Sequence, residues 1–230
     1  MPPKTLLSKL IIRSGVWFVA TAAILFLVAG TIAWPAAWIF LAVIHGYGLA
    51  IGLRLAKHDP DLLAERLASP FRTVQETWDR VFVLAVIVLL PTWFVVIPLD
   101  AMRFGSSHVP IGLQCVGAAT LLFSFHVVDM TFRANTYAAP VVRIQTERAH
   151  RVVSTGPYAY VRHPLYTGFV LFLLGTSLLL GSWYGLALAA APIAVLAWRA
   201  VHEERLLADR LAGYADYAAR VRYRLIPLLW

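Results

Sequence analysis

The sequence predicts an all-α, polytopic integral membrane protein with about six transmembrane helices. Of its 230 residues, 60% are hydrophobic and only 14% carry a charged side chain, whereas a soluble domain usually carries about 25% charged residues. Four long stretches contain no Lys, Arg, Asp or Glu. Almost all basic residues lie in four segments, and an even number of predicted membrane crossings separates each of these segments from the next. The four segments therefore lie on the same side of the membrane.

The first uncharged stretch, residues 14–53, predicts two membrane helices. It is 40 residues long, and one spanning helix needs about 20 residues. We place the turn at Trp34-Pro35, because proline interrupts the hydrogen-bond ladder of a helix. Three basic residues precede the stretch, but it is longer than the roughly 7–15 apolar residues of a secretory signal. We therefore expect a membrane helix there, with no cleaved leader.

The remaining stretches predict four further helices. Residues 81–99 and 104–128 each have the length of one span. Residues 163–198 form a run of 36 residues that is too long for one helix. Gly181-Ser182 is a turn signal that divides this run into a tight hairpin of two short helices.

The basic residues predict the orientation of these helices. Residues 1–13, 54–80, 133–162 and 199–224 hold 19 of the 20 Lys and Arg side chains. A six-helix count places these four segments on the same side, and the positive-inside rule makes that side the cytoplasm. Both termini are therefore expected to be cytoplasmic.

This placement also explains the net charge of +8. Such a charge could indicate a nucleic-acid-binding protein, but a basic collar at one end of a membrane bundle faces anionic lipid head groups. We expect no nucleic acid partner. Cys115 is the single cysteine, so no internal disulfide or metal site is expected, and we expect its side chain to be buried. Arginine outnumbers lysine 17 to 3, which is compatible with a GC-rich bacterial genome and hence a bacterial inner membrane.

Two polar segments follow the fourth helix. One runs from residue 133 to 164, and the other begins at Arg199 as an amphipathic helix and ends as a tail rich in arginine and tyrosine. The apolar hairpin holds them close together. In chain order they carry Gly156-Pro157-Tyr158, Arg162-His163-Pro164-Leu165-Tyr166-Thr167-Gly168, Arg199 with His202-Glu203-Glu204, Tyr214, Tyr217, and Val221-Arg222-Tyr223-Arg224-Leu225-Ile226-Pro227.

This series of elements resembles the isoprenylcysteine carboxyl methyltransferase family and the related membrane phospholipid N-methyltransferases. The resemblance covers roughly Asn135–Trp230. It implies transfer of a methyl group from S-adenosylmethionine to a lipophilic acceptor, in a pocket on the cytoplasmic side formed by the C-terminal half.

The resemblance also suggests a division of the chain. Residues 1–108 would hold helices one to three with the cytoplasmic loop 54–80. Residues 109–230 would form the methyltransferase-like core, with helix four, the polar segment 133–164, the hairpin 165–198, and the amphipathic helix and tail.

The residues suit the chemistry that the resemblance implies. Arg162 and His163 can bind the carboxylate of the cofactor, and Glu203 or Glu204 can bind its ammonium group. Aromatic side chains can flank the adenine, and glycines permit close approach. The expected cofactor-binding residues are His150, Val152, Val153, Gly156, Tyr158, Arg162, His163, Pro164, Tyr166, Gly168, Glu203 and Glu204, with Trp183 as a further candidate for the adenine wall.

Several of these residues have simpler interpretations. Arg162 could bind lipid head groups, and Trp183 could be an interfacial anchor. Arg199 and Glu203 are four residues apart and could form an ion pair on the helix surface. Asp129 could pair with Arg133 in the same way.

Asn135, Arg199 and Tyr217 are the expected catalytic residues, in the sense of positioning the acceptor. The sulfonium donor is already activated, so the protein mainly has to align donor and acceptor. A carboxylate acceptor needs no general base, whereas an amine has to be neutral to react. No catalytic triad and no metal ligand set is expected.

Two other classes remain open. Membrane sterol reductases share the Arg-His-Pro turn and the Tyr-Arg tail, and they use NADPH. Their turn typically reads Arg-His-Pro-Asn-Tyr-x-Gly-Glu, whereas Leu165 and Phe169 replace its Asn and Glu here. The third class is a non-enzymatic membrane sensor or assembly protein with the same fold.

Overall fold

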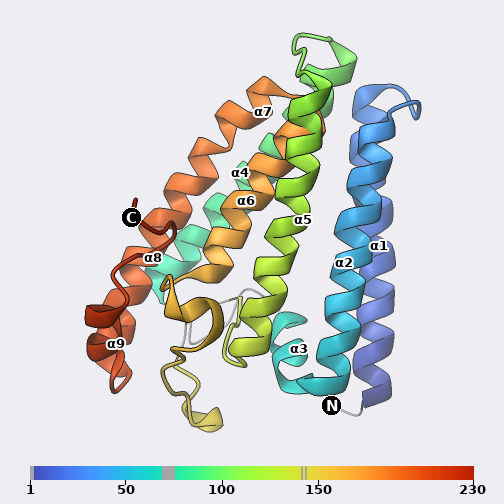
Figure 1. Ribbon diagram of the computed structural model, residues 1–230. Helices are drawn as coiled ribbons and strands as arrows, with labels where there is room; N and C mark the ends of the chain where they lie inside the picture. Colours follow the sequence, from blue (N-terminus) through green and yellow to red (C-terminus); the bar gives the residue numbers. More distant parts are fainter. Residues whose placement is uncertain (1–2, 69–75, 141, 143) are drawn as a thin grey trace.

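A computed structural model describes residues 3–68, 76–140, 142 and 144–230. Within these ranges the chain is helical and contains no strand (Figure 1). The prediction of an all-α polytopic protein is confirmed. Five described helices are long and apolar enough to cross a membrane. A shorter apolar helix, α6 (Pro164–Leu179), lies beside them.

The first two helices form an antiparallel pair, as predicted. Helix α1 (Pro3–Ala29) ends at Gly30, whose φ of 75° is the left-handed conformation that glycine tolerates best. Helix α2 begins at Pro35 and ends at His58. Proline suits this first position because no partner for its missing N–H would exist there. The short helix α3 (Pro60–Arg66) follows directly.

The third span begins earlier in the chain than its uncharged stretch suggested, and the fourth span begins later. Both extend further toward the C-terminus than expected. Helix α4 (Thr77–Pro98) continues into a π-helical turn, Leu99–Arg103. Helix α5 covers Ile111–Ala134, not residues 104–128.

The shift of α5 has a physical cause in its charged end. Asp129 lies 2.7 Å from Nε of Arg133 and 2.7 Å from Nη2 of Arg54. The predicted pair of Asp129 with Arg133 is confirmed. Because these charges neutralise one another, the helix can continue through them. Pro110 marks the other end of α5 as its N-cap.

The hairpin turn falls at Gly181-Ser182, as predicted, with Gly181 at a φ of 81°. Beyond it, α7 (Trp183–Leu188) and α8 (Ala190–Arg210) follow in line. The expected boundary at residue 198 was wrong, since α8 continues without a break to Arg210. No helix-breaking residue lies there, and Arg199 pairs within the protein. Helix α9 (Tyr214–Arg220) precedes the tail.

Helices α5 and α6 pack with their backbones in direct contact. A Cβ atom at Gly117 would lie 2.4 Å from the backbone nitrogen of Leu179, and one at Gly175 would lie 2.7 Å from that of Leu121. Neither backbone can move aside as a flexible side chain could. Small residues at a helix interface allow this close approach in membrane proteins, and the pair forms the centre of the bundle (Figure 1).

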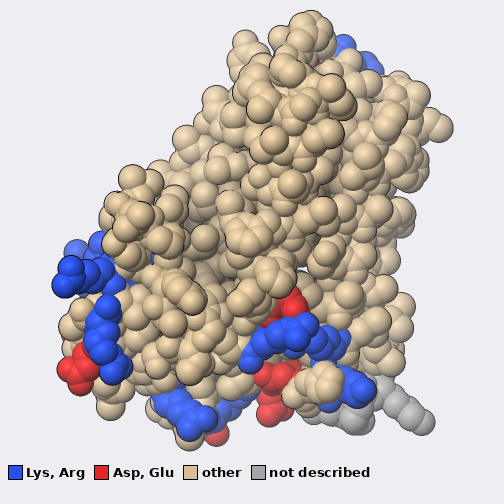
Figure 2. Space-filling view, viewed as in Figure 1, with Lys and Arg blue, Asp and Glu red and all other residues tan. Residues whose placement is uncertain are grey.

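The four basic segments lie at one end of the molecule. The N-terminus, the end of α2, the segment between α5 and α6, and α9 are found together at the lower end of Figure 1. Figure 2 shows most of the visible Lys and Arg side chains at that end. Arg72 and Arg143, which contribute to the charge count, lie outside the described residues. Cys115 is exposed on α5, contrary to expectation.

Candidate functional site

The segment between α5 and α6, the end of α8, and α9 enclose a cavity at the basic end of the bundle. Its volume is about 110 Å³, and charged and aromatic side chains line it, so we call it the polar cavity. Eleven of the predicted site residues line it. These are Asn135, His150, Val152, Val153, Tyr158, Arg162, His163, Tyr166, Arg199, Glu203 and Tyr217.

The remaining predicted residues are close to this wall but do not line the cavity. Gly156 begins the 3-10 turn Gly156–Ala159 with a φ of 60°. Pro164 is the first residue of α6, and Gly168 packs against Val128 of α5. Glu204 is turned away from the polar cavity.

Glu204 is held by three cationic or protonatable side chains. Its Oε1 lies 3.0 Å from Nε2 of His163 and 2.9 Å from Nε of Arg162. Its Oε2 accepts from Nε of Arg224 at 3.0 Å. Glu204 is only 9% exposed. Both carboxylate oxygens are therefore occupied within the protein, which argues against the expected role in binding the cofactor ammonium.

The same region is joined by backbone hydrogen bonds. The amides of Arg162 and His163 donate to the carbonyls of Tyr223 and Arg224, each at 2.9 Å. The hydroxyl of Thr167 donates to the carbonyl of Leu225 at 2.6 Å. These hydrogen bonds hold the C-terminal tail against the Arg-His-Pro turn. The Glu204 carboxylate contacts both segments, through Arg162 and His163 on the turn and Arg224 on the tail.

Glu203 is the carboxylate that faces the polar cavity. It accepts a hydrogen bond from the hydroxyl of Tyr166, and its Oε2 lies 3.9 Å from Nδ1 of His163. The rings of His163 and Tyr166 stack with centroids 5.1 Å apart. Adjacent residues on a helix point about 100° apart, which explains why the two glutamates have different surroundings.

Arg199 pairs with Asp79 of α4. Its Nε and Nη2 lie 2.9 and 2.8 Å from Oδ1 of Asp79, which is completely buried. Nη2 also donates to the carbonyl of Pro140 at 2.8 Å, and the guanidinium lies 4.1 Å above the ring of Phe82. The alternative interpretation, an ion pair with Glu203 on the helix surface, gives way to this contact across the bundle. It fixes the guanidinium at the cavity wall.

Tyrosines form another part of the wall. Asn135 donates through Nδ2 to the hydroxyl of Tyr158 at 2.8 Å, and the hydroxyl of Tyr217 donates to the carbonyl of Tyr158 at 2.8 Å. Burial raises the pKa of Tyr217 to about 12 and also raises the pKa of Tyr158. Both phenols therefore stay protonated at neutral pH and can act as hydrogen-bond donors.

Tyr214 lines the polar cavity but was not among the predicted site residues. Its hydroxyl is buried and has no hydrogen-bond partner among the described residues. Burial raises its pKa, and the nearby carboxylates of Glu204 and Glu203 add to the effect. A buried donor without a partner is costly, so this hydroxyl is available to a polar ligand.

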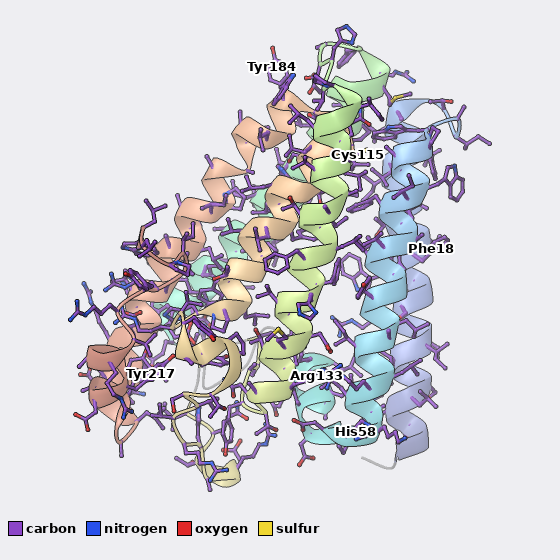
Figure 3. The ribbon with its side chains drawn as sticks, in the orientation of Figure 1. Phe18, His58, Cys115, Arg133, Tyr184 and Tyr217 are labelled. Atoms are coloured by element: carbon purple, nitrogen blue, oxygen red, sulfur yellow. The ribbon has the colours of Figure 1, made fainter. Side chains whose placement is uncertain are left out.

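Trp183 was wrongly considered for the adenine wall. It lies at the start of α7, beside Tyr184, at the end of the molecule opposite Tyr217 (Figure 3). Its amide donates to Oγ of Ser107 at 3.0 Å, and it is 41% exposed. This position is typical of an interfacial anchor.

A second cavity of about 550 Å³ lies deeper in the bundle. Side chains from α1 to α6 and α8 line it, and most are apolar, so we call it the apolar cavity. Ala139, Leu165, Tyr166 and Arg199 line both cavities. These four residues form a shared wall between a polar space at the basic end and an apolar space within the helices.

Comparison with known proteins bears on this arrangement. Residues 112–212 match the phospholipid methyltransferase family. The chain is 32% identical over 87 residues to protein-S-isoprenylcysteine O-methyltransferase B of Arabidopsis thaliana, which covers 35% of this chain and 42% of that protein. It is also 46% identical over 43 residues to protein-S-isoprenylcysteine O-methyltransferase of Schizosaccharomyces pombe. This second match covers 19% of this chain and 18% of that protein.

The predicted family resemblance is confirmed. The chain matches less than half the length of either relative, and the family segment contains α5, the polar segment, α6 and α8. Asp79, Tyr217 and Arg224 lie outside this methyltransferase-family segment, although all three contribute to the site.

Replacing Glu204 with glutamine should destabilise the protein. The change leaves the Arg162 and Arg224 charges without their carboxylate, and loss of one partner from a buried ion pair costs about 3–5 kcal/mol. Because Glu204 is not completely buried, we expect a loss near the lower limit. Thermal unfolding in a mild detergent should show a clearly lowered midpoint.

Glu203→Gln is the matched control, because it removes the neighbouring carboxylate charge, keeps an oxygen that can accept from Tyr166, and leaves the contacts of Glu204 with Arg162 and Arg224 in place. Its unfolding midpoint should stay close to that of the wild type. Equal midpoints for both variants would contradict a stabilising role of Glu204.

Proposed function

We propose that this protein is an integral membrane methyltransferase that uses S-adenosylmethionine to methylate a lipophilic acceptor. The wall shared by the two cavities is the observation that carries the proposal. Methyl transfer requires donor and acceptor to meet in line, with water excluded. A polar donor and an apolar acceptor need separate surroundings that adjoin at one point. The family match favours methyl transfer over the reductase and sensor alternatives.

The side chains that line the polar cavity suit the polar groups of the donor. When bound, S-adenosylmethionine supplies an electrophilic methyl group carried on a sulfonium. Glu203 would bind the ammonium group, and Arg162 would bind the carboxylate. The unpaired hydroxyl of Tyr214 offers a further hydrogen bond to a polar ligand. Tyr158 offers an aromatic surface to the adenine, and His150, Val152 and Val153 form the adjoining wall.

The acceptor would occupy the apolar cavity with its reactive group near the shared wall. Arg199 cannot swing away, because Asp79 and the carbonyl of Pro140 hold its guanidinium. It would orient a polar acceptor group at the wall. Asn135 and Tyr217 would position the acceptor from the polar side, where both are already part of one hydrogen-bonded network.

The acceptor class follows from the lining and the relatives. A long apolar chain matches the apolar cavity, and the names of the relatives point to isoprenylcysteine-type carboxyl O-methylation. A related small amphipathic lipid would suit the same space. A carboxylate acceptor would need no general base, which is compatible with a site that positions groups more than it transfers protons.

We propose that the two parts of the chain have different roles. Residues 109–230 would bind the donor, and residues 1–108 would complete the acceptor cavity and supply Asp79. We further propose that both termini and the polar cavity face the cytoplasm of a bacterial inner membrane. The confinement of 19 of 20 basic residues to four segments supports this orientation, and these segments share one end of the bundle.

Glu203→Gln should weaken binding of S-adenosylmethionine. A charge-assisted hydrogen bond is worth about 1.5–3 kcal/mol, which is roughly a 10- to 150-fold change in affinity. Calorimetry on detergent-solubilised protein measures it directly. Asp209→Asn removes an exposed carboxylate from the same helix and should leave the affinity unchanged. Unaltered affinity in Glu203→Gln would exclude the ammonium role.

Val86→Trp should block methyl transfer without affecting donor binding. Val86 lines the apolar cavity from α4, and an indole there would fill space that the acceptor chain needs. Protein is incubated with radiolabelled S-adenosylmethionine and native membrane lipids, and organic extracts are counted. We expect label in the wild-type lipid fraction and a loss of at least tenfold in the variant.

Val88→Trp is the control for this experiment, because Val88 lies on the same helix and is 64% exposed. It should transfer label normally. Absence of label with every lipid fraction, including isoprenylated cysteine analogues, would overturn the proposed activity.

The orientation predicts that a reporter enzyme fused after Trp230 is active only in the form that works in the cytoplasm. Fusion within residues 104–110, between α4 and α5, should give the opposite result. A periplasmic signal from the C-terminal fusion would refute the topology.

A further inference from the structure

The apolar cavity contains a second arginine besides Arg199. Arg66, the last residue of α3, lines it together with aliphatic and aromatic side chains. Its Nη1 donates to the carbonyl of Ala138 at 3.0 Å, and its guanidinium lies 4.4 Å above the ring of Phe132. The charge therefore lies at the boundary of a largely apolar space.

No carboxylate neutralises this charge. Arg199 is paired with Asp79, but no described Asp or Glu forms an ion pair with Arg66, and the residues that the structure leaves undescribed contain neither. Burial lowers the pKa of Arg66 to about 10, and the charge of Arg13 adds to the effect. The side chain is still protonated at neutral pH, but it gives up hydration without gaining an anionic partner.

Arg13 lies beside it. Its Nη1 donates to the carbonyl of Leu67, the residue that follows Arg66. Arg13 lines a smaller pocket between α1 and α2 of about 240 Å³. This pocket and the apolar cavity share Leu10, Gly48 and Leu67. Two positive charges thus flank the same end of the apolar cavity, and no described carboxylate forms an ion pair with either.

We propose that Arg66, assisted by Arg13, anchors the anionic head group of an amphiphile whose chain fills the apolar cavity. The ligand is a single-chain carboxylate or phosphate amphiphile. A guanidinium binds either group through paired hydrogen bonds. Identifying this amphiphile with the methyl acceptor rests on the proposed function, but its binding does not.

The position of the anchor suits an acceptor. Ala138, which accepts from Arg66, lines the polar cavity, and its neighbour Ala139 lines both cavities. An anion bound by Arg66 therefore lies close to the shared wall. Arg66 and Arg13 both precede the family segment at residues 112–212, so the family match does not assign them a role.

The test is a binding experiment without methyl donor. Palmitate, hexadecyl phosphate and hexadecanol share one chain length and differ in head group. Each is titrated against purified protein in a neutral detergent, and bound amphiphile is measured by native mass spectrometry. We expect the wild type to bind at least one of the two anions about tenfold or more tightly than the alcohol. The preferred anion distinguishes a carboxylate from a phosphate ligand.

Variants locate the preference. Arg66→Gln keeps a donor for the Ala138 carbonyl but removes the charge, and it should lose most of the preference for the anion over the alcohol. Arg13→Gln should lose part of the preference, and Arg66→Lys should retain most of it. Arg205→Gln removes an exposed charge from α8 and should behave as the wild type. Retained affinity for hexadecanol shows that the cavity is intact in each variant.

Equal wild-type affinity for anion and alcohol would overturn the proposal, as would an undiminished preference in Arg66→Gln. If Arg66→Gln does not fold, a preference that is kept in Arg66→Lys and reduced in Arg13→Gln supports the anchor, and any other pattern refutes it. Failure of methyl transfer alone would count against the proposed function but leave the anchor standing.

Discussion

The carboxylate of Glu204 joins three parts of the chain that the sequence keeps apart. It belongs to α8, and its partners are the turn that precedes α6 and the C-terminal tail. A largely buried carboxylate is stable only while its cationic partners, here Arg162 and Arg224, remain in place. The polar cavity is built upon this junction, because Arg162 and His163 line the cavity with the same side chains that hold Glu204.

The pair of Arg199 and Asp79 joins two helices, whereas Glu204 joins a turn and the C-terminal tail to one helix. It connects α8 to α4 at a point where both helices leave the apolar part of the bundle. Through this contact the wall between the cavities gains a fixed guanidinium. The first half of the chain thereby takes part in a site whose recognisable sequence lies in the second half.

Much of the architecture could be predicted from the sequence, because uncharged stretches and prolines are local signals. The pairing of Asp129 with Arg133 was predictable for the same reason, since a helix brings residues four apart together. The contact of Asp79 with Arg199 was not, because 120 residues separate them. Nor could the sequence distinguish Glu203 from Glu204, since their roles depend on which face of α8 meets the tail.

The direct contact of α5 and α6 at Gly117 and Gly175 has an evolutionary consequence. A side chain at either glycine would push the two helices apart, and both helices also contribute residues to the lining of the apolar cavity. Most of the rest of the lining comes from α1, α2, α3, α4 and α8, where no described backbone contact of this kind restricts the shape of the cavity. The shape of the apolar cavity can therefore diverge among related chains while the contact between α5 and α6, within the segment that matches the methyltransferase family, is retained.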